Sequence, residues 1–215
     1  MLLAAMSTPS LAQSTPEVSA NAGIVSDYRF RGVSLSNRKP ALQGGAELET
    51  DSFFAGGWAS TIADYSGADV ELDLYGGLHG SIGSVGYRVG AYAYVYPGGN
   101  DVNYIEVIAE GERTIGPVTL GVQAAFAPRQ DNVGSANHYV AASAAVETGG
   151  GVTATFRTGY EDGFYEDKWD WEIGASYTLA PVTASIAYID TNYSALNEAG
   201  RLGRGAVVGA FVTTF

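Results

Sequence analysis

Apolar and polar residues alternate along most of the chain. In the segment 118–126 every second residue is apolar, with Thr119 and Gln123 between them. Because successive side chains of a strand point to opposite faces, this pattern predicts two-faced β-strands, whereas a helix needs apolar residues three and four apart. The alternation recurs in about twelve segments of roughly ten residues, the length of a tilted strand that crosses a bilayer. The first is expected between Gln13 and Leu35, and the weaker ones are 52–62, 137–147 and 205–215.

Short turns alternate with longer polar connections between these segments. The turns Ser81–Val85, Thr114–Val118 and Thr178–Val182 are near copies, and similar ones lie at 49–52 and 147–151. They recur about every 32 residues, one strand pair apart. The other connections are longer: 34–39, 63–67, 97–102, 129–136, 162–168 and 191–204. The arrangement predicts an all-β fold, an up-and-down antiparallel transmembrane β-barrel with short periplasmic turns and longer extracellular loops.

Composition narrows the alternatives to this prediction. The 215 residues include 29 Gly and no Cys, which excludes a disulfide scaffold and a Cys-ligated metal site. Only two His are present, and the net charge of −12 argues against nucleic-acid binding. The chain has no apolar run of the roughly 18 residues that a membrane-spanning helix needs. A soluble all-β protein and a membrane barrel are therefore the classes that fit, and the turn spacing favours the barrel.

Both ends of the chain resemble those of an exported barrel. Residues 1–12 resemble the end of a signal peptide cleaved after Ala12, which would leave 13–215 as a single barrel domain; the alternative is a disordered terminus. Phe215 ends the last segment, with Phe211 and Val207 on its face, like a signal for the barrel-insertion machinery. The expected location is the bacterial outer membrane, with outer-membrane lipid and lipopolysaccharide as contacts.

If the apolar faces meet lipid, the charged residues between them point into the barrel. The pore-lining candidates are Asp27, Arg29, Arg31, Glu47, Glu71, Asp73, Arg88, Glu106, Glu110, Arg157, Asp170 and Glu172. Charges inside a barrel must be paired or hydrated. The set therefore fits a water-filled path for small polar or charged solutes, or a plugged lumen whose core is made of Arg–carboxylate pairs.

Aromatic residues near the strand ends are expected to form outward girdles at the membrane interfaces. This set is Trp58, Trp169, Trp171, Tyr28, Phe30, Tyr160, Tyr177 and Tyr188. Tyr92, Tyr94 and Tyr96 point the other way, where a sugar-stacking platform is an alternative.

The sequence offers little for catalysis. His79 and Ser81 have the two-residue spacing of His and Ser in barrel phospholipases, but they lie at a short turn without a supporting residue. The acidic segment 161–168 carries oxygen ligands that calcium binds, yet its spacing matches no defined loop. We therefore predict no catalytic residue, no metal and no cofactor.

Two stretches carry a family resemblance. Residues Ser26–Ser34 (SDYRFRGVS), followed by Pro40–Gln43 (PALQ), resemble the TorF-like porins, also known as the Gcw_chp family of proteobacterial proteins. Residues Tyr94–Gly98 and Asn103–Glu106 resemble that family's second recurring stretch. The resemblance implies an exported outer-membrane porin of undefined solute. The matching positions are Asp27, Arg31, Gly32, Pro40, Tyr94, Pro97 and Glu106.

The leading hypothesis is an outer-membrane, porin-like channel for passive diffusion of small polar or charged solutes. Within it, Arg31 and a carboxylate partner such as Glu106 shape a constriction, or alternatively fix the barrel register. The other function class is a non-conducting structural or interaction barrel whose extracellular loops, especially 191–204, bind a surface partner.

Overall fold

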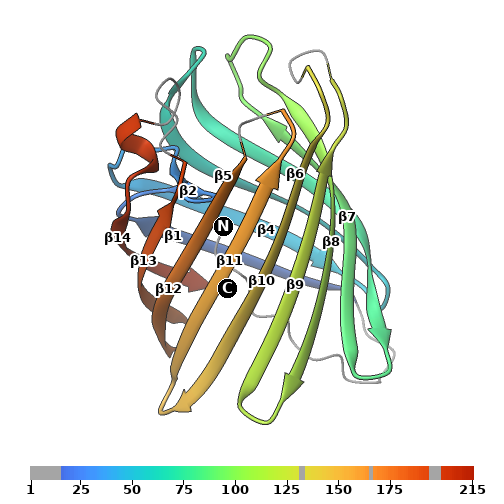
Figure 1. Cartoon of the computed structure of the whole chain (residues 1–215). Helices are drawn as coiled ribbons and strands as arrows, with labels where there is room; N and C mark the ends of the chain where they lie inside the picture. The colour runs from blue at the N-terminus through green and yellow to red at the C-terminus, as the bar shows by residue number, and fades with distance from the viewer. Residues whose placement is uncertain (1–15, 131–133, 165–166, 194–199) are drawn as a thin grey trace.

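The computed structural model describes residues 16–130, 134–164, 167–193 and 200–215. Twelve strands close into one antiparallel barrel, in which neighbours along the chain are neighbours in the wall (Figure 1). They are β1 (Glu17–Val25), β4 (Ala41–Glu49), β5 (Phe53–Tyr65), β6 (Ala68–Ile82), β7 (Val85–Val95), β8 (Tyr104–Ile115), β9 (Val118–Ala127), β10 (Asn137–Gly149), β11 (Val152–Asp162), β12 (Lys168–Leu179), β13 (Val182–Thr191) and β14 (Ala206–Thr214). Pairing of β1 with β14 closes the barrel. The predicted fold class is confirmed; the predicted signal peptide, 1–12, lies outside the described residues.

The two ends of the barrel differ in their connections. At one end, here called the turn end, short turns join β4–β5, β6–β7, β8–β9, β10–β11 and β12–β13. The opposite, loop end carries the longer connections and a 3₁₀ helix, η1 (Gly200–Gly203). The predicted loop 63–67 is wrong, because β5 and β6 continue until Ser66 and Gly67 turn the chain with φ of 54° and 99°. No helix among the described residues is long and apolar enough to cross a membrane.

The first strand is shorter than predicted. It ends at Val25, and the chain then forms the inner hairpin, residues 26–36, which contains β2 (Arg29–Phe30) and β3 (Val33–Ser34). Arg31 and Gly32 turn this hairpin with φ of 46° and 84°, as a tight two-residue turn requires. The expectation that 13–35 forms one strand is therefore wrong. The period-two pattern continues unbroken into the hairpin, so the pattern does not show where β1 ends.

The inner hairpin lies inside the barrel. Its Tyr28 ring contacts Trp58 of β5 at a centroid distance of 5.4 Å, and its Phe30 ring contacts Tyr94 of β7 at 5.9 Å. Arg31 pairs with residues of β8 and β11. These contacts reach wall strands around the barrel, so the hairpin fills the interior near the loop end.

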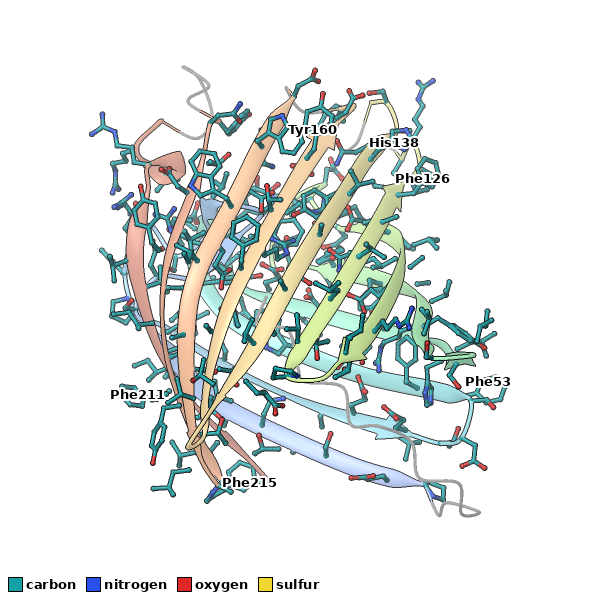
Figure 2. All side chains as sticks on the ribbon, turned by 60° about the horizontal axis from the view of Figure 1, so that its bottom comes forward. Phe53, Phe126, His138, Tyr160, Phe211 and Phe215 are labelled. Atoms are coloured by element: carbon teal, nitrogen blue, oxygen red, sulfur yellow. The ribbon has the colours of Figure 1, made fainter. Side chains whose placement is uncertain are left out.

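The outer surface is apolar. Outward side chains such as Leu42, Ile173 and Val207 are about 60–65% exposed, as lipid-facing residues of an outer-membrane barrel are. Figure 2 shows aromatic residues near both rims, with Phe126, His138 and Tyr160 towards the loop end and Phe53, Phe211 and Phe215 towards the turn end.

The aromatic prediction is correct for part of its set. Trp169, Tyr177 and Tyr188 are exposed on the outer surface. The prediction is wrong for Tyr28, Phe30 and Trp58, because these side chains face inwards. The first two belong to the inner hairpin, and the third lies on the inward face of β5, beside Tyr28.

Candidate functional site

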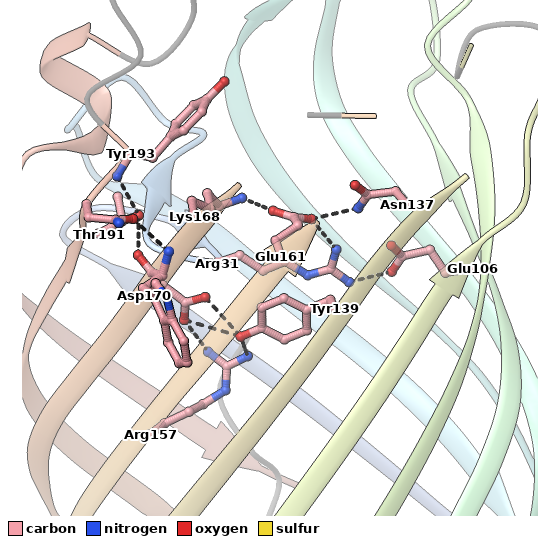
Figure 3. A network of polar contacts seen from close by, with 12 residues as sticks. Arg31, Glu106, Asn137, Tyr139, Arg157, Glu161, Lys168, Asp170, Thr191 and Tyr193 are labelled. Carbon is pink, nitrogen blue, oxygen red and sulfur yellow. Dashed lines mark hydrogen bonds and ion pairs between the residues drawn. The ribbon is translucent and has the colours of Figure 1, made fainter. Parts of the chain in front are cut away.

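Arg31, at the tip of the inner hairpin, sits between two carboxylates of the barrel wall (Figure 3). Its Nη1 donates to Glu161 Oε1 at 2.6 Å, and its Nη2 donates to Glu106 Oε2 at 2.7 Å. The guanidinium carbon lies 4.2 Å from the ring centroid of Tyr139 and 4.6 Å from that of Phe30. The side chain is only 5% exposed, so the site combines charge-assisted hydrogen bonds and ring faces away from water.

The wall holds both carboxylates through further contacts. Glu161 accepts a hydrogen bond from Asn137 Nδ2 at 2.9 Å and pairs with Lys168. Glu106 accepts a hydrogen bond from the Tyr94 hydroxyl at 3.2 Å. These partners come from β7, β10 and β12, so the wall orients the carboxylates independently of the inner hairpin.

A second ion pair lies beside this site and shares the Tyr139 side chain (Figure 3). Arg157 Nη1 lies 3.0 Å from Asp170 Oδ1, and Nη2 donates to the Tyr139 hydroxyl at 2.5 Å. The same hydroxyl donates to Asp170 Oδ2 at 3.0 Å. Tyr139 is therefore fixed at its hydroxyl while its ring face contacts Arg31.

The base of the inner hairpin is a polar unit of its own. Asp27 accepts hydrogen bonds from Arg29 Nε at 2.8 Å and from Ser34 Oγ at 2.5 Å. Arg29 also donates to the backbone oxygens of Gly32 and Arg204, both at 2.9 Å. These bonds satisfy the buried Asp27 and Arg29 without contributions from the wall strands.

A pair of buried carboxylates lies on the adjoining wall. Glu71 and Asp73, on the inward face of β6, are 1% and 7% exposed. Glu71 Oε1 accepts a hydrogen bond from the Tyr28 hydroxyl at 3.1 Å. Within the described parts of the chain, Glu71 Oε2 and Asp73 Oδ1 have no hydrogen-bond partner, and neither residue forms an ion pair.

The ion-paired side chains inside the turn end are more exposed than those of the Arg31 site. Arg88 Nη2 lies 2.6 Å from Glu47 Oε2, and these side chains are 12% and 23% exposed. Glu110 accepts a hydrogen bond from Gln123 at 2.7 Å. Small residues occupy many inward positions of the wall here, including Gly45, Gly121, Ser143, Gly174 and Ser185.

The structure sorts the pore-lining candidates into two groups. Asp27, Arg29 and Arg31 lie in the inner hairpin, so their assignment to the first barrel strand is wrong. The others are on inward faces of wall strands: Glu47, Glu71, Asp73, Arg88, Glu106, Glu110, Arg157, Asp170 and Glu172. That they line an open path stays a prediction.

Sequence reasoning missed part of the Arg31 site. Glu161 and Lys168 pair across β11 and β12, although the sequence placed both in an acidic loop. Counting in steps of two from the candidate Arg157 would have put Glu161 on its inward face. Tyr139 carried no signal in the sequence beyond its place in a weak strand.

The family-motif positions meet in space. Arg31 of the first stretch pairs with Glu106 of the second, whose other hydrogen bond comes from Tyr94. Gly32 lies at the tip of the inner hairpin, where an added Cβ would be 2.7 Å from Thr191 Cβ. Pro40 directly precedes β4, and Pro97 follows β7.

The structure also shows where the residues considered for sugar stacking, hydrolysis and metal binding lie. Tyr92, Tyr94 and Tyr96 point inwards and pack in the interior core at 1–7% exposure, and that they stack on a sugar stays a prediction. His79 Nε2 lies 2.7 Å from the Thr50 carbonyl oxygen, and Nδ1 lies 3.8 Å from Glu49. No group of three or more His, Asp or Glu among the described residues is arranged to hold a metal ion.

Comparisons with known proteins add the following. The profile of a family described as "Bacterial protein of unknown function (Gcw_chp)" matches residues 10–211. No curated protein matches the sequence. The fold is similar to "KdgM porin", with a TM-score of 0.62, 6% identity, and coverage of 92% of this chain and 98% of that one. A "NanC porin" structure has a TM-score of 0.60 and 10% identity, and the match covers 92% of this chain and 98% of that one. The "COG4313 outer membrane channel from Pseudomonas putida F1" has a TM-score of 0.58 and 10% identity, and the match covers 98% of this chain and 100% of that one.

Proposed function

Because the chain belongs to the Gcw_chp family and folds as an outer-membrane β-barrel like those of small channels, we propose that it is a channel for passive diffusion of small polar or charged solutes. In this proposal the inner hairpin closes the channel at the loop end, and the solute gradient is the driving force. No cofactor and no catalytic step take part.

One observation carries the proposal: the segment that fills the loop end forms no strand ladder with the wall. β2 and β3 pair with each other and with none of the barrel strands. The backbone bonds of the inner hairpin to the wall lie at its two ends, where Ser26 N donates to Gly209 O and Ala63 N donates to Leu35 O, both at 2.8 Å. Between these ends the inner hairpin is held by side-chain contacts, so displacing it leaves the strand ladders of the wall intact. Wall side chains fill barrels of about eight strands, and this barrel has twelve, so the hairpin supplies the filling of the loop end and its displacement opens that end.

The charges favour cations among the permitted solutes. The inward wall positions carry Glu47, Glu71, Asp73, Glu106, Glu110, Asp170 and Glu172 against Arg88 and Arg157 from the same set. A pore with an excess of carboxylates lowers the energy of a cation inside it and raises that of an anion.

Planar-bilayer recordings test the proposal. Residues 27–35 are replaced by a short Gly-Ser linker, and the control replaces residues 97–103 of the β7–β8 loop in the same way. We expect little current from the unaltered barrel and the control, and steady cation-selective current from the hairpin variant. A hairpin variant that shows the heat-dependent gel mobility of a folded barrel and still carries no current would contradict the channel.

A non-conducting structural or interaction barrel is the second candidate. The observation that favours it is the dense core near the loop end, where Tyr92, Tyr94, Ile108 and Tyr139 pack together. Failure of the hairpin variant to conduct would favour this candidate. Binding of lipopolysaccharide, of the insertion machinery through the strand ending at Phe215, and of a surface partner through the loops stays a prediction.

A further inference from the structure

We infer that the carboxylates that hold Arg31 form a binding site for organic cations of the guanidinium or amidinium class, and that Arg31 occupies this site when the channel is closed. The inference rests on the proposed channel and names a solute class for it. We call the wall residues Glu106, Glu161 and Tyr139 the cation seat.

The geometry of the seat fits a planar, forked cation. The two carboxylates accept from different nitrogens of one guanidinium, at 2.6 and 2.7 Å, while the Tyr139 ring lies 4.2 Å from its carbon. A planar guanidinium has several fixed N–H donors and a face that stacks on rings. An ammonium group is a compact, strongly hydrated charge and lacks both features. The seat therefore selects by shape as well as by charge.

The seat persists without Arg31 because its members are fixed by the wall. Tyr94 holds Glu106, Asn137 and Lys168 hold Glu161, and Asp170 holds the Tyr139 hydroxyl. A site whose groups are oriented before the ligand arrives loses less entropy on binding. The ring of Phe30, by contrast, belongs to the inner hairpin and leaves with it.

The backbone of Arg31 adopts a conformation that is unusual for an arginine. Arg31 has φ of 46° at the first position of a tight turn, where Asn, Asp and Gly are the usual residues. Its local conformation is therefore unfavourable, and its contacts with the seat compensate for it. Such strain is typical of positions kept for function.

Displacement of the inner hairpin leaves the seat in need of a cation. The wall around the seat and the β6 pair carries Glu71, Asp73, Glu106, Glu161 and Asp170 against Arg157 and Lys168. Without Arg31, Glu106 has no ion-pair partner in the described structure. A guanidinium solute that takes the place of Arg31 restores the same contacts, so the solute and the inner hairpin compete for one site.

Chemical rescue tests the inference. The Arg31→Ala protein is purified in detergent, and its unfolding midpoint is measured from the heat-dependent gel shift with methylguanidinium, methylammonium or sodium chloride at equal ionic strength. We expect saturating methylguanidinium to raise the midpoint by about 5 °C and the other salts to leave it unchanged. The unaltered protein, whose seat is full, is expected to show no specific shift.

Two double variants assign the effect to the seat. In Arg31→Ala/Glu106→Gln the rescue should disappear. In Arg31→Ala/Glu110→Gln, which alters a carboxylate on the same face of β8 outside the seat, the rescue should persist. If Arg31→Ala does not fold, Arg31→Gln keeps most of the side-chain volume and is used in the same way. Equal effects of methylguanidinium and methylammonium, or rescue that survives Glu106→Gln, would overturn the inference.

The channel and the seat can fail separately. Current through the hairpin variant without methylguanidinium rescue overturns the seat and leaves the channel. Rescue without current in the hairpin variant overturns the channel, and with it the role of the seat in permeation. Support for both requires rescue together with current that methylguanidinium, but not methylammonium, reduces at the same concentration.

Discussion

The two halves of the barrel interior contain the same kinds of ion pair in different surroundings. Near the loop end, the side chains of Arg31, Glu106 and Glu161 are 5%, 2% and 3% exposed. Near the turn end, those of Arg88 and Glu47 are 12% and 23% exposed, at a similar separation of 2.6 Å. A buried charge that loses its partner is strongly destabilising, whereas a hydrated one is not. Burial, rather than the presence of an Arg–carboxylate pair, therefore decides which contacts hold the closed state.

The inner hairpin creates this difference. The wall strands run through both halves and supply inward carboxylates to each. Only the loop end receives an additional segment, whose Arg31 and aromatic residues exclude water. At the turn end no such segment is present among the described residues, and the paired side chains of Arg88 and Glu47 are more exposed. Variants that change one half while leaving the other intact separate the two contributions.

The largest expected effect comes from removing Arg31. Arg31→Ala leaves Glu106 buried without its cation, and we expect a loss of about 3 kcal/mol in the free energy of unfolding. Arg88→Ala at the turn end should cost about 1 kcal/mol or less. Urea unfolding in detergent, followed by tryptophan fluorescence, measures both. Equal losses in the two variants would show that the halves do not differ as their burial indicates.

Glycines in positive-φ turns provide the next comparison. Gly32→Ala adds a Cβ 2.7 Å from Thr191 Cβ, at φ of 84°, and should destabilise the closed state by about 2 kcal/mol. Gly83→Ala, in the turn between β6 and β7, has φ of 63° but open space around the added carbon. It should cost about 1 kcal/mol from backbone strain alone.

Bilayer recordings separate these two glycine variants further. Gly32→Ala should increase the open probability, because its clash pushes the inner hairpin away from β13. Gly83→Ala should leave the current at the level of the unaltered barrel. An increase in both variants would mean that general loosening of the barrel, and not release of the hairpin, opens the path.

The strands and turns could be predicted from the sequence because period two and recurring turn residues are local signals. The inner hairpin could not, because Asp27, Arg29 and Arg31 alternate with Tyr28 and Phe30 as they would in a strand. Their polarity reflects bonds within the hairpin rather than an inward strand face. The alternation of polar and apolar residues was therefore real, but it belongs to the inner hairpin and not to the first wall strand.

The partners of Arg31 were only partly predictable. Glu106 was a candidate because it alternates with apolar neighbours and lies in a family stretch, and the structure pairs it with Arg31. Glu161 was missed because its contact with Arg31 depends on how far the hairpin reaches across the barrel. A distance across the interior is set by strand tilt and register, which leave no local trace in the sequence.

The β6 carboxylates should respond in the opposite direction from Glu106. Asp73 is buried beside Glu71 without an ion-pair partner among the residues described. Asp73→Asn replaces a buried carboxyl group that has no ion-pair partner by an uncharged amide of similar size, so we expect unfolding free energy to rise by about 1 kcal/mol. Glu106→Gln should lower it, because Arg31 then loses a partner. A loss in both variants would indicate that a cation binds the β6 pair.

Salt provides the smallest and most selective change. Screening acts on hydrated charges, since the Debye length falls from about 10 Å at 0.1 M to about 3 Å at 1 M salt. Raising sodium chloride over this range should therefore remove most of the small cost of Arg88→Ala, whose ion pair is hydrated. The cost of Arg31→Ala should change little, because Arg31 and its two carboxylates are only 2–5% exposed and mobile ions do not reach them. If the cost of Arg31→Ala falls in parallel with that of Arg88→Ala, ions reach the loop-end site and the inner hairpin opens on the timescale of the measurement.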